Sequence, residues 1–215
     1  IMPEQIIPKS DSKKRGLFPE IEPFKKNIVN TGDGHQIYFE ECGNPNGIPV
    51  LVVHGGPGGG CSPSMRRYFD PDAYYIVLFD QRGCGRSRPY ASINNNTTWH
   101  LLSDMELIRK KLNVEKFILF GGSWGAALSL IYSQKYPEMV SKIILRGVFT
   151  MTIEELNWFY QEGGASKFWP EAWRSFRDML PPSERKNIIH GYHTRLFGSS
   201  PIEQGRYARA WTAWE

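Results

Sequence analysis

The stretch that most constrains the fold of this chain is residues 117–128, an apolar run that ends at the sequence GGSWG and continues into small apolar residues. The spacing G-x-S-x-G over residues 121–125, between a strand pattern and a helix pattern that extends to Tyr136, is typical of a nucleophile elbow. A serine on so sharp a turn has a strained backbone, and its neighbours carry almost no side chain. The turn places the Ser123 hydroxyl at a helix N-terminus, where N–H groups favour developing negative charge. The flanking patterns favour this interpretation over a glycine-rich turn with an incidental serine.

A second glycine-rich segment follows the apolar run at residues 50–53, which is typical of a strand buried on both faces. The segment is residues 54–60, with the sequence HGGPGGG. A loop so poor in side chains lets a ligand approach the backbone, and its N–H groups can turn toward an oxyanion. Pro57 within the loop and His54 at the strand end argue against a flexible surface loop. The spacing is not that of a phosphate-binding loop.

Polar side chains follow four of the predicted strands at the points where those strands end: His54, Asp80, Ser123 and Arg146. Strands and helices alternate from residue 50 to residue 147, which predicts a mostly parallel sheet with helices on both faces. Ligands in such sheets bind at the carboxyl ends of the strands, so we expect an active site there. We also expect Asp80 to pair with Arg82 and to brace the loop beside this site.

The remaining pattern changes after residue 148. Before residue 50 we expect an N-terminal arm over residues 1–23 and a hairpin of residues 25–30 and 36–41 around a Gly/Asp turn. A helix over 99–112 is predicted, capped by Thr97 or Thr98. After residue 148 the sequence predicts only helices, over 153–160, 168–180, 183–197 and 201–214.

Charge and cysteine content exclude several kinds of partner. The net charge is +4, with no dense Lys/Arg stripe, so we expect no nucleic-acid partner. The longest apolar run, residues 74–79, is too short to span a membrane, and no signal peptide is evident. Three widely spaced cysteines argue against a disulfide framework or a zinc site. These features favour a cytoplasmic protein.

The motifs taken together resemble the proline iminopeptidase (prolyl aminopeptidase) family, which are serine peptidases of the α/β-hydrolase fold. The resemblance extends from about residue 18 to the end of the chain. It is carried by HGGPG at 54–58, DQRGCGRS at 80–87, NTTW at 96–99, GGSWG at 121–125, LRGVF at 145–149 and WTAWE at 211–215. It implies an α/β-hydrolase core over residues 1–149 and a helical cap over residues 150–215.

This resemblance also implies an activity and a set of site residues. The activity is removal of an N-terminal proline from peptides through an acyl-enzyme on Ser123, with no metal or cofactor. The oxyanion hole would be formed by the backbone N–H groups of Trp124 and Gly56. Glu215 would bind the free amine of the substrate, although its alternative is an exposed terminal carboxylate. The other substrate-binding residues implied are Gly55, Arg146, Phe149 and Tyr160.

The sequence departs from the family pattern in its catalytic base. A nucleophilic serine needs a histidine oriented by an acid, in the chain order Ser, Asp/Glu, His. After Ser123 the only histidines are His190 and His193 and the only aspartate is Asp178, all within the predicted helical segment. We therefore expect this chain to lack the C-terminal part that carries the catalytic aspartate, the catalytic histidine and the last strands of the sheet. Alone, it is predicted to be inactive; a triad with His190 or His193 is the alternative.

Two other functions remain open at the level of sequence. One is an esterase or amidase of the same fold, with the same elbow but no requirement for a substrate amine. The other is a non-catalytic binding protein on a hydrolase-like fold, which the missing histidine suggests.

Overall fold

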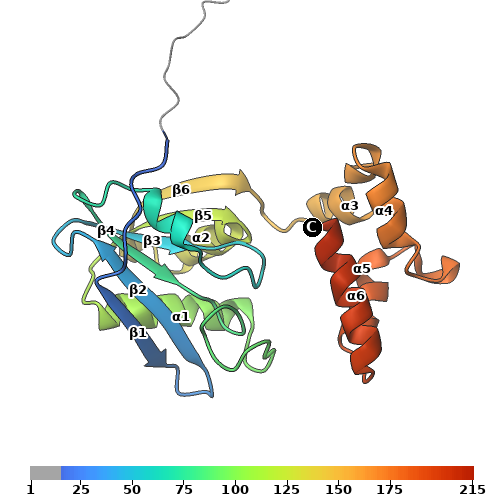
Figure 1. The fold of residues 1–215 in the computed structure, drawn as a ribbon, viewed down its shortest axis with the longest axis horizontal. Helices are drawn as coiled ribbons and strands as arrows, with labels where there is room; N and C mark the ends of the chain where they lie inside the picture. The colour runs from blue at the N-terminus through green and yellow to red at the C-terminus, as the bar shows by residue number, and fades with distance from the viewer. Residues whose placement is uncertain (1–15) are drawn as a thin grey trace, which may run out of the picture. The chain divides into compact units, whose positions relative to one another are not determined.

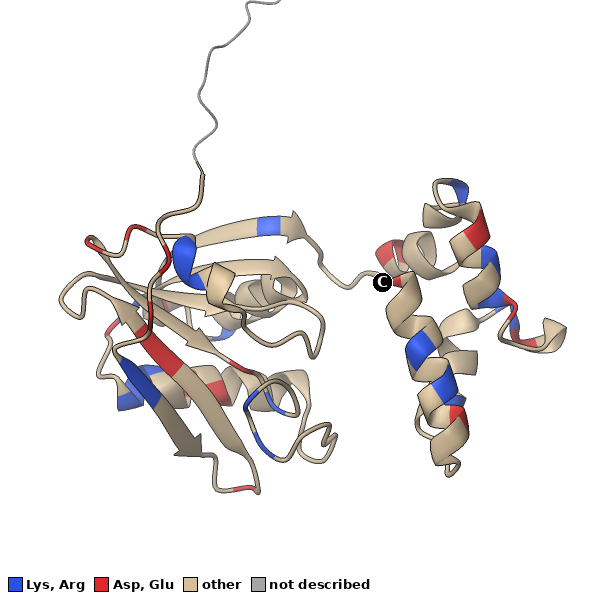
Figure 2. Cartoon of the chain, in the orientation of Figure 1, with Lys and Arg blue, Asp and Glu red and all other residues tan. Residues whose placement is uncertain are grey.

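The computed structural model describes residues 16–215 and divides the chain into two units, one that ends at Val148 and one from Phe149 to Glu215 (Figure 1). Part of the expected N-terminal arm, residues 1–15, lies outside the described residues. The rest of the arm lies on the first unit, where the Phe18 N–H donates to the Arg67 carbonyl at 3.1 Å. Lys and Arg are interspersed with Asp and Glu in each unit (Figure 2). Among the described residues, no helix combines the length and apolar character needed to cross a membrane.

The first unit is built on a six-stranded mixed sheet in the order β1-β2-β4-β3-β5-β6. The predicted hairpin is present, with β1 and β2 antiparallel, and β2 is also antiparallel to β4. The pairs β4–β3, β3–β5 and β5–β6 are parallel. The strands are β1 (Lys25–Asn30), β2 (Gln36–Gly43), β3 (Ile48–Val53), β4 (Tyr74–Phe79), β5 (Phe117–Ser123) and β6 (Val140–Val148).

Two α-helices, α1 (Thr98–Lys111) and α2 (Trp124–Lys135), contribute side chains to the same hydrophobic cluster on one face of the sheet. The expectation of helices on both faces is wrong for the described part of this unit. The other face is covered by the short 3-10 helix η1 (Pro63–Arg67) and the segment around Ile21. The β3–β4 connection crosses this face. Its first residues form the glycine-rich loop, and the remaining residues are too few for more than the short helix η1.

The register of the parallel strands brings the predicted site residues to one edge of the sheet. Val53 of β3 pairs with Gly121 of β5, and Gly122 pairs with Arg146 of β6. The chain leaves β3 and β5 at this edge, so the glycine loop and the elbow lie next to each other. The convergence of these loops, predicted from strand ends alone, is confirmed.

The second unit consists of four α-helices around an aromatic core. They are α3 (Ile153–Tyr160), α4 (Pro170–Arg177), α5 (Ile188–Leu196) and α6 (Pro201–Trp214). The predicted bounds of α3 and α6 are confirmed, whereas α4 and α5 are shorter than predicted. Helix α5 begins after Asn187 because the Asn187 side chain accepts a hydrogen bond from the His190 N–H and caps it. Residues 182–184, which overlap its predicted first turn, form a separate 3-10 turn.

Candidate active site

Ser123 lies at the sharp turn from β5 into α2, in the strained conformation that the elbow pattern predicts. Its φ is 55° and its ψ is −122°, a region that residues other than glycine rarely adopt. A Cβ on Gly121 would lie 2.2 Å from the Gly125 carbonyl oxygen, and one on Gly125 would lie 2.1 Å from that of Val53. The turn closes only because these two positions have no side chain.

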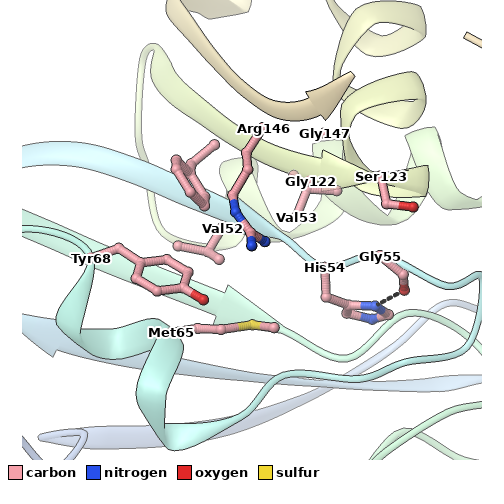
Figure 3. Close-up of a pocket in the computed structure, with 11 residues that line it drawn as sticks. Val52, Val53, His54, Gly55, Met65, Tyr68, Gly122, Ser123, Arg146 and Gly147 are labelled. Carbon is pink, nitrogen blue, oxygen red and sulfur yellow. Dashed lines mark hydrogen bonds between the residues drawn. The ribbon is translucent and has the colours of Figure 1, made fainter. Parts of the chain in front are cut away.

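A cavity of about 380 Å³ opens beside this serine (Figure 3). Three residues predicted from the sequence line it: Ser123, Gly55 and Arg146. The Arg146 side chain points into the cavity from the end of β6. The full lining is Val52, Val53, His54, Gly55, Met65, Tyr68, Phe120, Gly122, Ser123, Arg146 and Gly147. The lining is mostly apolar side chains and backbone, and its polar side chains are those of Ser123, Arg146, Tyr68 and His54.

The sequence did not predict Met65 and Tyr68 as cavity residues. Met65 belongs to η1 and Tyr68 directly follows it, and this segment is too short to give a periodic pattern. Arg66 fixes this segment because its Nε donates to Glu40 at 2.7 Å while both side chains are buried. Arg86 donates to the same carboxylate at 3.1 Å. Burial alone would raise the pKa of Glu40, but Arg66, Tyr38 and Arg86 outweigh it and hold that pKa below its usual range.

The glycine loop lies directly against the nucleophile. A Cβ built on Gly55 would lie 3.4 Å from the Ser123 Cβ. Gly56 has a φ of 116°, and a Cβ there would lie 2.5 Å from the Gly58 nitrogen. Gly56 is therefore restricted to glycine by both its conformation and its surroundings. Backbone of this loop therefore lies next to Ser123.

His54 has both ring nitrogens engaged away from Ser123. Its Nδ1 bonds the Gly55 carbonyl at 2.8 Å, and its Nε2 accepts from the Gln81 N–H at 3.0 Å. The residue is 2% exposed. Burial lowers the pKa of His54, which keeps the imidazole neutral. His54 therefore acts as a structural residue of the loop and not as the base for the serine.

The expected pair of Asp80 and Arg82 is wrong. The Asp80 carboxylate accepts from Arg86 Nε at 2.7 Å, the Arg86 N–H at 2.8 Å and the Cys61 N–H at 2.7 Å. Burial alone would raise the pKa of Asp80, but these donors outweigh it and keep that pKa below its usual range. Arg82 instead pairs with the buried Asp104 of α1 through two hydrogen bonds of 2.6 and 2.7 Å. Both pairs brace the loop after β4.

Three predicted substrate-binding residues, Phe149, Tyr160 and Glu215, belong to the second unit. The Tyr160 hydroxyl donates to Glu215 Oε1 at 2.5 Å. Burial first, and then the Glu215 carboxylate, raise the pKa of Tyr160, so its hydroxyl remains a donor. The Tyr160 ring stacks on Trp211 at 4.7 Å between centroids. Glu215 is thus oriented by an aromatic side chain that is itself fixed by packing.

The alternative histidines also lie in the second unit, on α5. The His193 ring packs on Phe197 at 4.6 Å between centroids. Asp178, the only aspartate after Ser123, pairs with Arg177 at 2.7 Å and with Arg185 at 3.2 Å. Its carboxylate is therefore used by arginines and does not orient a histidine.

Comparisons with known proteins agree with this geometry. A family model described as alpha/beta hydrolase fold matches residues 48–208. The chain is 48% identical over 201 residues to a proline iminopeptidase of Xylella fastidiosa (strain Temecula1). The matched region covers 94% of this chain and 64% of that protein. It is 48% identical over 203 residues to a proline iminopeptidase of Arabidopsis thaliana, covering 94% and 53%.

Among solved structures, a proline iminopeptidase-related protein from Thermus thermophilus gives a TM-score of 0.54 at 27% identity, over 88% of this chain and 65% of that one. The chain thus spans less than two thirds of the length of the curated relatives described above. The family model extends from β3 into α6, across both units, and the chain therefore belongs to the α/β-hydrolase family, within which it is similar to proline iminopeptidases.

Proposed function

We propose that the protein carrying this chain is a serine exopeptidase that releases N-terminal proline from peptides. The observation that carries the proposal is the strained Ser123 beside a cavity, with the glycine loop against it. The printed names of the relatives support the choice of substrate. Peptides with an N-terminal proline are the proposed partners, and no metal or cofactor takes part in the proposed reaction.

In this proposal the Ser123 Oγ attacks the carbonyl carbon of the N-terminal prolyl residue. The carbonyl oxygen becomes an oxyanion, which the backbone N–H groups of Trp124 and Gly56 stabilise. Collapse of the intermediate breaks the C–N bond as the general base returns the Oγ proton to the leaving nitrogen, which departs as an amine. A prolyl ester remains on Ser123, and water then hydrolyses it. The proton from Oγ passes to a general base. Both ring nitrogens of His54 are engaged and Asp178 is paired with arginines, so we propose that this base and its orienting acid lie outside these 215 residues, with a triad through His190 or His193 as the alternative.

Glu215 is proposed to bind the protonated amine of the substrate. An exopeptidase must favour a charged amine at one fixed distance from the nucleophile, and an oriented carboxylate provides that selection. The Tyr160 hydroxyl holds one Glu215 oxygen and leaves the other for a ligand. Phe149 and Tyr160 would provide apolar surface for the proline ring, and Arg146 and Gly55 would lie near the reacting carbonyl.

The nucleophile is tested by Ser123→Ala in the intact protein, with proline p-nitroanilide as substrate. We expect kcat to fall by at least about 10³-fold, because the acyl-enzyme can no longer form. Ser133→Ala is the matched control, since Ser133 lies on α2, the helix that follows Ser123, and its hydroxyl donates to the Leu130 carbonyl. A Ser123→Ala protein that retains activity would remove Ser123 as the nucleophile.

The amine site is tested by Glu215→Gln and by a substrate whose amine is blocked. We expect Glu215→Gln to raise KM for the free-amine substrate by about 10-fold or more, because a charge-assisted contact is lost. Glu203→Gln, at the other end of α6, is the control. A wild-type enzyme that hydrolyses the N-blocked substrate equally well is an esterase or amidase without an amine requirement. No turnover of either substrate would favour a non-catalytic binding protein.

A further inference from the structure

A buried carboxamide joins the two backbone segments that flank Ser123. Gln81 follows β4 and is 2% exposed. Its Nε2 donates to the His54 carbonyl at 2.9 Å, and its Oε1 accepts from the Trp124 indole N–H at 3.0 Å. A carbonyl only accepts and an indole N–H only donates, so these partners determine which way the amide faces. The Gln81 side chain therefore connects the glycine loop to the residue that begins α2.

The backbone of Gln81 acts on the same loop through the His54 ring. Because His54 Nε2 accepts from the Gln81 N–H at 3.0 Å, the ring proton is assigned to Nδ1. That Nδ1–H donates to the Gly55 carbonyl at 2.8 Å, where the Gly59 N–H also donates at 3.2 Å. The carbonyl groups of His54 and Gly55 are thus both held by donors. Gln81 donates to the first directly and supports the second through the His54 ring.

The direction of a carbonyl in a trans peptide determines the direction of the next N–H, because the two lie in one plane and point opposite ways. The carbonyl of His54 therefore orients the N–H of Gly55, and the carbonyl of Gly55 orients the N–H of Gly56. A Cβ built on Gly55 would lie 3.4 Å from the Ser123 Cβ, so both N–H groups belong to backbone beside the nucleophile. Trp124, which supplies the other N–H, is held by the same carboxamide.

We propose that Gln81 is a positioning residue for the oxyanion hole, acting on the glycine loop through His54 and on the elbow through Trp124. This inference rests on the proposed function, in which Gly56 and Trp124 donate to the oxyanion. A misdirected N–H weakens binding of the oxyanion more than binding of the ground-state carbonyl. Removing one oxyanion donor costs about 10²–10³ in kcat, so a displaced donor should cost about 10–100-fold.

The test is Gln81→Glu in the intact protein, with Asn96→Asp as the matched control. The introduced carboxylate still accepts from Trp124 but cannot donate to the His54 carbonyl. Asn96 undergoes the same change of amide to acid, and its amide donates to the Arg82 and Ser92 carbonyls at 3.2 and 2.9 Å. With proline p-nitroanilide we expect Gln81→Glu to lower kcat by about 10–100-fold and to change KM by less than about threefold. Asn96→Asp should leave kcat within about twofold.

A second readout separates this inference from the proposed function. Phosphonylation of Ser123 by a fluorophosphonate needs the oxyanion hole but no prolyl group, and it should slow by a similar factor in Gln81→Glu. If the wild type reacts with the probe but does not cleave the prolyl substrate, the proposed function fails and this readout still tests Gln81. The inference would be overturned if kcat and the phosphonylation rate were both unchanged in Gln81→Glu. It would also be overturned if active-site titration attributed the whole loss of activity to fewer folded molecules. If Gln81→Glu does not fold, Trp124→Phe removes the indole N–H together with part of a buried ring. Among folded molecules counted by active-site titration, it should lower kcat at constant KM.

Discussion

The three glycines of the elbow differ in how strictly the structure requires them. A side chain at Gly121 or Gly125 would overlap a backbone carbonyl oxygen, whereas a Cβ at Gly122 would meet only the Arg146 carbonyl at 3.7 Å. The last of these is an ordinary van der Waals contact. The requirement for glycine therefore falls on the positions two before and two after Ser123, which are the fixed positions of the G-x-S-x-G pattern.

This difference predicts unequal effects of one methyl group. Gly121→Ala places a Cβ 2.2 Å from the Gly125 carbonyl oxygen and should lower the free energy of unfolding by about 1–3 kcal/mol or more, because backbone must move. Gly122→Ala, the adjacent control, should cost less than about 1 kcal/mol. Urea unfolding of the intact protein measures both. Equal losses would show that the elbow relaxes freely and that Gly121 is not sterically required.

The incorrect partner for Asp80 shows what a sequence pattern lacks at this scale. Asp80 and Arg82 are close in sequence, but the chain between Asp80 and Arg86 curls back over the carboxylate. Gly85 packs so closely that a Cβ there would lie 2.4 Å from Asp80 Oδ2. This turn delivers Arg86, and neither spacing nor composition specifies it. The position of Asp80 at the strand end was predictable, but its partner was not.

The Arg82 side chain connects the loop after β4 to helix α1. Its guanidinium forms two hydrogen bonds to Asp104, and both side chains are 2% exposed. Burial raises the pKa of Asp104, and the Arg82 guanidinium beside it opposes this rise. A charge left alone at this depth is more costly than the absence of both charges.

Arg82→Met leaves Asp104 buried without its partner, and we expect it to lower the free energy of unfolding by about 3–5 kcal/mol. Asp104→Leu should cost less, because Arg82 still pairs with Asp33 at 2.6 Å. The double variant should be clearly less destabilised than the sum of the two, because neither member of the buried pair remains. The measurement is a double-mutant cycle from denaturant unfolding. Additive losses would mean that the two side chains contribute independently and that the pair does not connect the loop to α1.

The elements themselves were largely predictable because their patterns are local. Residues 50–53 and 74–79 have the pattern of buried strands, and both lie within observed strands. The start of α5 was missed because residues 182–184 form a separate 3-10 turn and Asn187 caps the helix that follows. The placement of α1 and α2 on one face was also missed, since periodicity specifies which side of a helix is apolar but not which face of a sheet it covers.

At the scale of the whole molecule, each unit has a hydrophobic core of its own. The sheet unit has one cluster on each face, and the helical unit has an aromatic cluster centred on Phe176. Phe176 is 2% exposed and stacks on Tyr192 at 4.4 Å and on Trp214 at 5.7 Å between centroids. Regions with separate cores can open separately, with their own free energies of opening.

This organisation predicts that damage to the aromatic core remains local. Phe176→Ala removes a buried ring at a cost of about 3–5 kcal/mol and should lower hydrogen-exchange protection of amides in residues 149–215. The amides of β3 and β5 should keep their protection, and Ser123 should keep its reactivity toward a fluorophosphonate. Phe168→Ala, in the same unit but at a side chain that is 70% exposed, is the control and should change neither. Loss of protection in β3 and β5 would show that the two cores unfold as one, because the sheet unit would then depend on the aromatic cluster for its stability.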